Sequence, residues 1–227
     1  MSFKDVVWQA LAYLFIFKRQ LTQALLIPFI ISMTLDIVTE VVVDSKVLLG
    51  STTLLTLIIQ TIIAITTHRI ILIGPNSIPK WGNFNWSKRE TLFTLYVVGL
   101  CFMLLPFTLF QFIPAVGGLI SLVLYAWFVS RFSLVFPGIA VDQGVTFKLS
   151  WTLTKDRQLM MFLVVIILPA LTLIPSVLLK FLAIFLSSSV LPYTIPITSF
   201  LSTFATVFTV VALSVSYKLI YADTYKN

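Results

Sequence analysis

The stretch LMMFLVVIILPALTLIPSVLL, Leu159–Leu179, decides the fold class of this 227-residue chain. It holds no charged side chain, and a helix of roughly 20 mostly apolar residues crosses the hydrocarbon core of a bilayer. The whole chain shares this bias, because 59% of its residues are hydrophobic and only 10% are charged. A soluble domain carries roughly 25% charged residues. The composition therefore excludes a soluble globule and predicts a multipass membrane protein.

Five further stretches are long and apolar enough to span. They are residues 21–38, 47–67, 91–112, 117–136 and 195–219. Strands of a membrane β-barrel alternate in polarity over about 10 residues, whereas these runs are continuously apolar. The sequence thus predicts an all-α membrane protein with six transmembrane helices, in a single membrane domain that covers residues 1–227.

The basic residues predict the orientation of the spans. If the N-terminus is cytoplasmic, only Lys46 and Lys180 of the 15 basic residues fall on the outer side. Cytoplasmic loops of membrane proteins carry an excess of Lys and Arg, so both termini are expected to be cytoplasmic. The net charge of +7 then faces anionic lipid headgroups, and a nucleic-acid partner is not expected.

Amphipathic segments precede the spans. Residues 3–20 separate Lys4 and Gln9 from Val6 and Ala10 on a helix, which suits a helix in the membrane interface. Residues 142–157 form a second such segment, and the prolines around Trp81 make a third segment more loop than helix. The alternative for residues 3–20 is a further span that is too short to cross.

A weak internal repeat accompanies these segments. The tetrads that precede the first, third and fifth spans are Lys18-Arg19-Gln20-Leu21, Lys88-Arg89-Glu90-Thr91 and Asp156-Arg157-Gln158-Leu159. They predict three helical hairpins, each led in by an interfacial element. The alternative is that every cytoplasmic entry attracts Trp, Lys and Arg without any duplication.

Two intramembrane polar residues are candidate site residues. Asp36 lies near the outer end of the first span and Gln60 near the middle of the second. Polar groups within a membrane often mark ion or proton pathways. The structural alternative places Asp36 in the outer headgroup zone and gives Gln60 an interhelical hydrogen bond.

Three arginines are candidate contacts for anionic lipid: Arg69, Arg131 and Arg157. Arg131 lies inside the end of the fourth span, from where it could snorkel to the interface or pair with Asp142 or Asp156. The alternative for all three is simple anchoring of helix ends by basic residues.

Catalytic signatures are missing from the sequence. His68 is the only histidine and Cys101 the only cysteine, which excludes paired-His and multi-Cys metal sites. No metalloprotease, nucleophile-elbow, P-loop or dinucleotide motif occurs. We therefore expect no catalytic, cofactor-binding or metal site. Pro28, Pro106, Pro169 and Pro175 lie within apolar runs and predict kinked or broken helices.

The string Arg131-Phe132-Ser133-Leu134-Val135-Phe136-Pro137-Gly138-Ile139-Ala140-Val141-Asp142, followed by Leu149-Ser150-Trp151-Thr152-Leu153-Thr154-Lys155, resembles a cytoplasmic hairpin of uncharacterised bacterial inner-membrane proteins of the YciC-like type. It is similar to the membrane domain attached to some glycerophosphodiester phosphodiesterases. The resemblance implies a bacterial inner-membrane protein and carries no catalytic residues, because the phosphodiesterase chemistry belongs to a separate soluble domain.

Two functions fit these patterns, and the first is the leading hypothesis while the second is its alternative. The first is a non-enzymatic membrane protein that organises lipids or membrane partners, either another protein or a second copy of the chain. The second is a small transporter or permease subunit, which requires a polar cavity between spans that reaches Asp36 or Gln60. An intramembrane enzyme is the least expected class.

Overall fold

The computed structural model describes residues 2–41, 45–186 and 191–224. Within these ranges the chain is helical and contains no β-strand. Six of its helices are long and apolar enough to cross a membrane. The predicted fold class, a helical protein with six candidate spans, is confirmed at this level.

The helices follow one another in the order α1 (Phe3–Ile16), α2 (Lys18–Val41), α3 (Lys46–Leu72), α4 (Lys88–Leu104), α5 (Gly117–Phe132), α6 (Val135–Ala140), α7 (Phe147–Leu153), α8 (Gln158–Phe162), α9 (Leu168–Leu186) and α10 (Leu191–Thr224). Short 3-10 turns lie at η1 (Pro75–Ser77), η2 (Leu105–Phe112) and η3 (Lys155–Arg157), and a π-helical turn lies at η4 (Leu163–Ile167).

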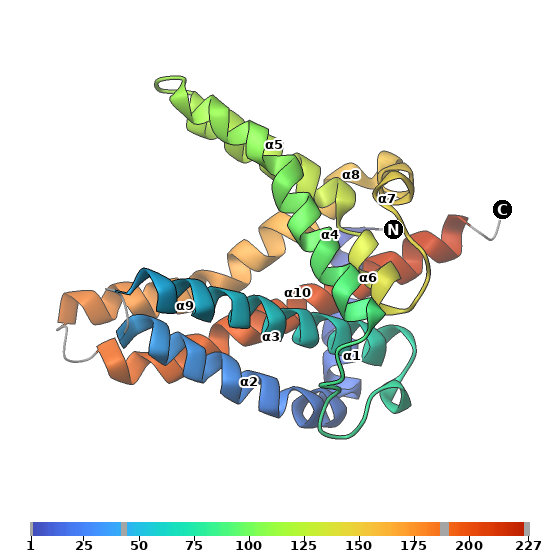
Figure 1. Ribbon diagram of the computed structural model, residues 1–227. Coiled ribbons are helices and arrows are strands. Elements are labelled where there is room, and N and C mark those ends of the chain that lie inside the picture. Colours follow the sequence, from blue (N-terminus) through green and yellow to red (C-terminus); the bar gives the residue numbers. More distant parts are fainter. Residues whose placement is uncertain (1, 42–44, 187–190, 225–227) are drawn as a thin grey trace.

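A bundle of four helices forms the body of the molecule. The helix α10 is its centre and packs against α9, α3 and α2. Figure 1 shows α2, α3, α9 and α10 side by side along one direction. The end of the bundle at which α2 and α9 terminate is called the loop end. The opposite end, where the chain termini lie, is called the terminus end.

A second unit, the arm, is made of α4, η2 and α5. Here η2 packs along α5, while α4 packs on α3 and α6. The arm points away from the bundle (Figure 1). Its apolar side chains are largely exposed, as at Phe112, Leu109 and Leu119, which is the surface expected of a segment that faces lipid rather than water.

Five of the six candidate spans continue beyond their apolar runs into flanking polar or basic residues, whereas the fourth is extended only by residues 137–140, after α5 has ended at Phe132. The third and fifth spans are also irregular. The chain turns from α-helix to 3-10 helix at Leu105, beside Pro106, and a π turn ends just before Pro169. A proline ring displaces the carbonyl four residues earlier and removes a backbone donor, so the irregular turns beside Pro106 and Pro169 have a local cause. Pro28 and Pro175, in contrast, lie inside the continuous helices α2 and α9.

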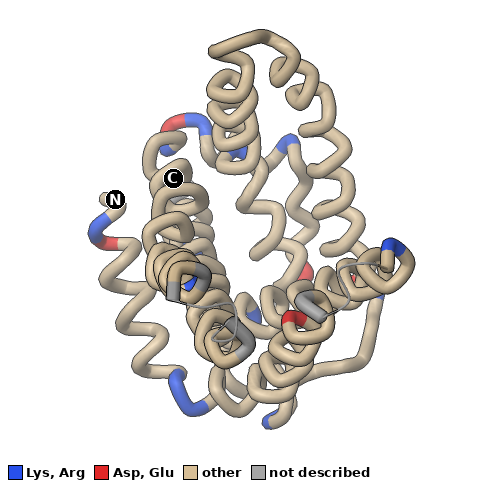
Figure 2. Tube along the Cα trace, turned by 90° about the vertical axis from the view of Figure 1, so that its left-hand side faces the viewer, with Lys and Arg blue, Asp and Glu red and all other residues tan. Residues whose placement is uncertain are grey.

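The helix α1 lies across the terminus end of the bundle in Figure 1, and in Figure 2 it runs from the N label down one side of the molecule. Ser2 and Asp5 form a reciprocal capping box at its start, and the hydrogen bonds that Ser2 donates to Asp5 hold the pKa of that carboxyl below its usual value. Val6 and Ala10 are fully buried, and Lys218 of α10 donates a 3.0 Å hydrogen bond to the Tyr13 hydroxyl. The predicted helical segment is thus shorter than 3–20 and separate from α2.

Candidate functional site

A polar cavity of about 510 Å³ lies within the bundle. Its walls come from α2, α3 and α10, with one side chain from α9, and every lining residue except Ile195 has a polar or charged side chain. The lining residues are Ser32, Asp36, Thr39, Thr53, Thr56, Gln60, Lys180, Thr194, Ile195, Thr198, Ser199, Ser202, Thr203 and Thr206. Ligand pockets commonly measure about 300–1,000 Å³, so the cavity has room for a small solute.

Asp36 provides the cavity with a carboxylate. Its Oδ2 atom accepts a 2.6 Å hydrogen bond from the hydroxyl of Ser199, which joins α2 to α10. Within the described part of the chain, no Lys or Arg lies within ion-pair distance of this carboxylate. The charge of Asp36 is therefore open to a ligand in the cavity.

Gln60 provides an amide from α3. It is half-buried and lines the cavity, and no hydrogen bond to it is recorded among residues 2–41, 45–186 and 191–224. The interhelical bond expected for this residue is thus not seen there. An amide has two donor hydrogens and one acceptor oxygen, and at Gln60 these can serve a ligand or water.

Four of the threonine hydroxyl groups in the wall donate their hydrogen to a backbone carbonyl and are left as acceptors. Thr39, Thr53 and Thr206 each donate to the backbone carbonyl four residues earlier, at 2.7, 2.8 and 3.0 Å. Thr198 likewise donates to the carbonyl of Ile195. A hydroxyl has a single hydrogen but two lone pairs, so what these residues offer the cavity is oxygen lone pairs. Together with Asp36, they make a wall that suits a hydrogen-bond donor of positive charge.

The cavity stops near the middle of the bundle. Beyond Thr206, the side chains of Val211, Ala212 and Ser214 in α10 are fully buried. In α3, the residues that follow Gln60 are buried as well, including Ile63 and Thr67. A tightly packed plug therefore separates the polar cavity, which lies toward the loop end, from the terminus end.

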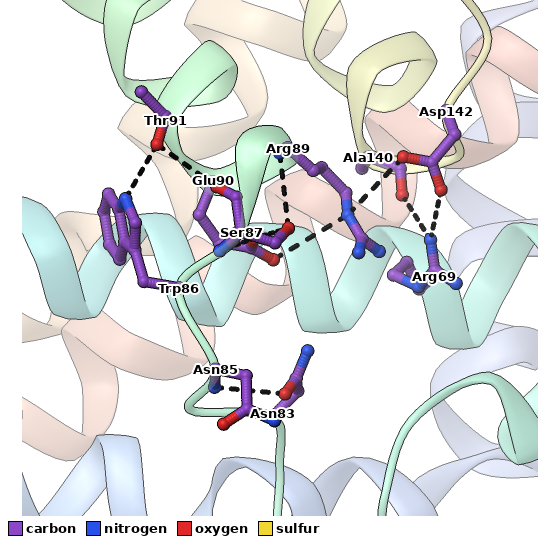
Figure 3. Close-up of polar contacts among 10 residues, drawn as sticks. All are labelled: Arg69, Asn83, Asn85, Trp86, Ser87, Arg89, Glu90, Thr91, Ala140 and Asp142. Atoms are coloured by element: carbon purple, nitrogen blue, oxygen red, sulfur yellow. Dashed lines mark hydrogen bonds and ion pairs between the residues drawn. The ribbon is translucent and has the colours of Figure 1, made fainter.

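Charged side chains gather into a second polar group near the terminus end (Figure 3). Arg69 of α3 donates to Asp142 and to the carbonyl of Ala140, both at 3.0 Å. Arg89 of α4 lies 3.7 Å from both Asp142 and Glu90. Asp142 adopts a left-handed backbone with φ of 61°. This cluster ties α3, α4 and the end of α6 together, and its charges are already paired.

Arg131 has a different environment from Arg69. Its guanidinium lies 4.9 Å from the ring of Trp151 and 5.7 Å from that of Trp127, and Nη1 donates to the Trp151 carbonyl at 3.3 Å. Among the described residues no ion pair joins Arg131 to Asp142 or Asp156, since Asp142 pairs with Arg69 and Arg89 instead. The left-handed turn at Asp142 redirects this acidic residue toward α3 and α4.

Arg157 is half-buried where α8 begins. The contacts of Arg69 and Arg131 involve different elements, the end of α6 for the first and α7 for the second. A shared headgroup site for the three arginines stays a prediction.

The described part of the chain holds no cluster of metal-ligating side chains. No group of three His, Cys, Asp or Glu side chains there could hold a metal ion. His68 is buried, and its Nδ1 lies 2.7 Å from the Ser214 hydroxyl. That hydroxyl also lies 2.8 Å from the Val210 carbonyl, and its single hydrogen can be donated to only one of these two acceptors at a time.

The sequence singled out Asp36 and Gln60, and the cavity brings them together. Sequence reasoning missed Lys180 and the hydroxyl residues of α10 from Thr194 to Thr206. The available signal was the density of Ser and Thr in the first half of the sixth span. Comparison of the chain with family models, with curated proteins and with solved structures finds no match.

Proposed function

We propose that this protein is a small transporter or permease-type membrane protein that binds a polar solute in the cavity among α2, α3 and α10. The main support for this proposal is that Asp36 and Gln60, from two different candidate spans, line one cavity whose walls are rich in hydroxyl groups. Such polarity is unfavourable within a membrane unless it serves water or a solute. Of the two functions that fit the sequence, only transport explains why the protein contains a polar cavity.

The plug beside the cavity favours a carrier over an open channel. A channel needs a continuous path, whereas the residues beyond Gln60 and Thr206 are tightly packed. A carrier exposes its site to one side at a time and rearranges its helices between the two states. The cavity open toward the loop end corresponds to one such state.

The chemistry of the wall favours a solute with an ammonium group. Ammonium is a compact cation with three donor hydrogens, which match the Asp36 carboxylate and the hydroxyl lone pairs. Lys180 lines the same cavity from α9 and offers a positive charge to a carboxylate. Small amines and zwitterionic amino acids are therefore the solute classes that we propose.

The topology and location that we propose follow the basic residues. Both termini face the cytoplasm, the six spans form three hairpins, and the cavity opens to the outside. The resemblance of residues 131–155 to YciC-like proteins supports placement in a bacterial inner membrane. Membrane lipids, together with a membrane protein or a second copy of the chain, are the proposed partners.

Uptake by proteoliposomes tests the function. The purified protein is reconstituted and given radiolabelled methylammonium, and separately alanine. We expect uptake of at least one above protein-free liposomes, and Asp36→Asn to reduce it at least tenfold. Asp5→Asn, which removes an exposed carboxylate of α1, should leave uptake unchanged. Uptake equal to that of protein-free liposomes for both solutes would reject the proposed solute classes.

Thiol labelling tests whether water reaches the cavity in the membrane. In a Cys101→Ser background, Gln60→Cys is expected to react with a membrane-impermeant thiol reagent. Leu55→Cys is the matched control on α3, since Leu55 is exposed on the protein surface but does not line the cavity. If both cysteines are equally protected from the thiol reagent, water does not reach the cavity, and the basis of the transporter proposal is removed.

A further inference from the structure

A second hollow, apolar rather than polar, lies where α1, α2 and α10 meet. Its volume is about 430 Å³, and we call it the apolar groove. Leu14 and Phe15 of α1, Leu25 of α2 and Phe204 of α10 are typical of its walls. Among its lining residues, Lys18 carries the only charge.

Lys18 stands at one end of the apolar groove. It is the first residue of α2 and is exposed. At the other end the rings of Phe29 and Phe200 meet edge to face, with their centroids 6.0 Å apart. Lys18 and Phe29 are eleven residues apart along α2, which at 1.5 Å per residue is about 16 Å.

This length matches one leaflet of a membrane. The hydrocarbon core is roughly 30 Å thick, so each leaflet contributes about 15 Å. The groove follows a membrane-spanning helix from its basic end to about the middle of the span. An acyl chain that enters beside Lys18 would therefore end where the two phenylalanine rings close the groove.

We infer that the apolar groove binds one acyl chain of an anionic phospholipid, whose phosphate lies against the Lys18 ammonium. The apolar wall accounts for the chain, and the single cation at its end accounts for the headgroup charge. The site uses none of Arg69, Arg131 and Arg157. It is also independent of the proposed transport, since the groove and the polar cavity have only Thr203 in common among their lining residues.

Native mass spectrometry of the detergent-solubilised protein tests this site. The protein is mixed with phosphatidylglycerol or with phosphatidylcholine of the same acyl chains. We expect one phosphatidylglycerol to be retained at low activation energy, and Lys18→Gln to lower its retention about fivefold, the effect of about one basic residue near a lipid surface. The retention of phosphatidylcholine should not change in that variant.

Two matched controls separate this groove from general lipid adhesion. Lys88→Gln removes an exposed lysine at the start of α4 and should leave retention intact. Leu26→Trp fills the groove and should lower retention of both lipids, whereas Leu55→Trp adds the same bulk to an exposed position on α3 and should not.

Three results would overturn the inference. One is an equal loss of phosphatidylglycerol in Lys18→Gln and Lys88→Gln, which would indicate unspecific attraction. Another is unchanged retention in Leu26→Trp when the variant melts at the wild-type temperature. The third is a lipid-free dimer that Leu26→Trp dissociates, because a second copy of the chain would then occupy the groove.

Discussion

The hydroxyl of Ser199 on α10 donates a 2.6 Å hydrogen bond to the carboxylate of Asp36 on α2, across 163 residues of sequence. The bond joins two spans at the wall of the polar cavity. It uses Oδ2 of the carboxylate, and no bond to Oδ1 is recorded among the described residues. Asp36 is therefore oriented by the protein and still able to accept from a ligand.

The first prediction concerns this pair. Asp36→Ala and Ser199→Ala should each destabilise the protein, and a double-mutant cycle should give a coupling of about 1 kcal/mol. A hydrogen bond to a charged group contributes roughly 1.5–3 kcal/mol, and the open position of Asp36 toward the cavity reduces it. Thermal unfolding in detergent measures the coupling. Strictly additive effects of the two substitutions would show that the bond is not formed.

The second prediction concerns Asp142, which faces Arg69 and Arg89. Asp142→Asn should lower the free energy of unfolding by roughly 0.5–1 kcal/mol at low salt, because Arg69 loses its carboxylate partner and Arg89 keeps only Glu90, while the shape of the side chain remains. Asn also tolerates the left-handed backbone at this position. The loss should shrink at high salt, which screens exposed ion pairs. Melting curves of the two proteins at low and high sodium chloride concentration measure it.

A substitution at Glu90 is the comparison for that experiment. Glu90→Gln also removes a carboxylate near Arg89. In addition, it weakens the helix cap of α4, because the backbone N–H of Ser87 donates to the Glu90 carboxylate. Its effect should persist at high salt. A salt-independent loss in Asp142→Asn would contradict the ion-pair account of this cluster.

The six spans could be predicted from sequence because hydrophobic length is a local property, readable in a run such as Leu159–Leu179. Asp36 and Gln60 could be marked as polar residues in apolar surroundings. Their common cavity could not be predicted, because the density of Ser and Thr in the sixth span does not reveal which helices these hydroxyls face. Only the packing of α2, α3 and α10 places these hydroxyls beside Asp36.

Asp142 illustrates a second limit. Its closeness in sequence to Arg131 suggested an ion pair between them, whereas the structure pairs Asp142 with Arg69 and Arg89. The direction of the chain after α6 depends on the left-handed turn at residue 142. Sequence spacing does not reveal which helix such a turn will face.

The third prediction concerns His68 and Ser214, which are buried in the plug beyond the cavity. The Ser214 hydroxyl lies 2.8 Å from the Val210 carbonyl. We expect its hydrogen to be donated to that carbonyl, so that the His68 ring carries a proton on Nδ1. Nitrogen-15 NMR of histidine-labelled protein should show that Nδ1 is protonated. Ser214→Ala should cost about 1–3 kcal/mol of stability, since it leaves a buried donor without its acceptor.

Ser216→Ala is the control for that substitution. Ser216 is equally buried on α10, but its hydroxyl donates only to the Ala212 carbonyl within the same helix. Ser216→Ala should therefore lower the free energy of unfolding only slightly. A histidine with only Nε2 protonated, or equal losses in the two serine variants, would contradict the assigned direction of the hydrogen bond.

The fourth prediction concerns the packing of α6 on the segment that follows it. A Cβ atom added at Gly138 would lie 2.3 Å from Cγ2 and 2.5 Å from Cβ of Val145, and both residues are buried. Gly138→Ala should therefore destabilise the protein by about 1–3 kcal/mol through overpacking. Gly118→Ala is the control, because no atom lies within 4 Å of a Cβ built there, and it should be neutral or slightly stabilising.

Val145→Gly tests the same contact by compensation. It opens a cavity and should destabilise the wild type, yet in the Gly138→Ala background it should recover part of the lost stability because it removes both clashing carbons. Thermal unfolding of the four proteins in the cycle measures this compensation, and additive losses would show that Gly138 and Val145 are not in contact.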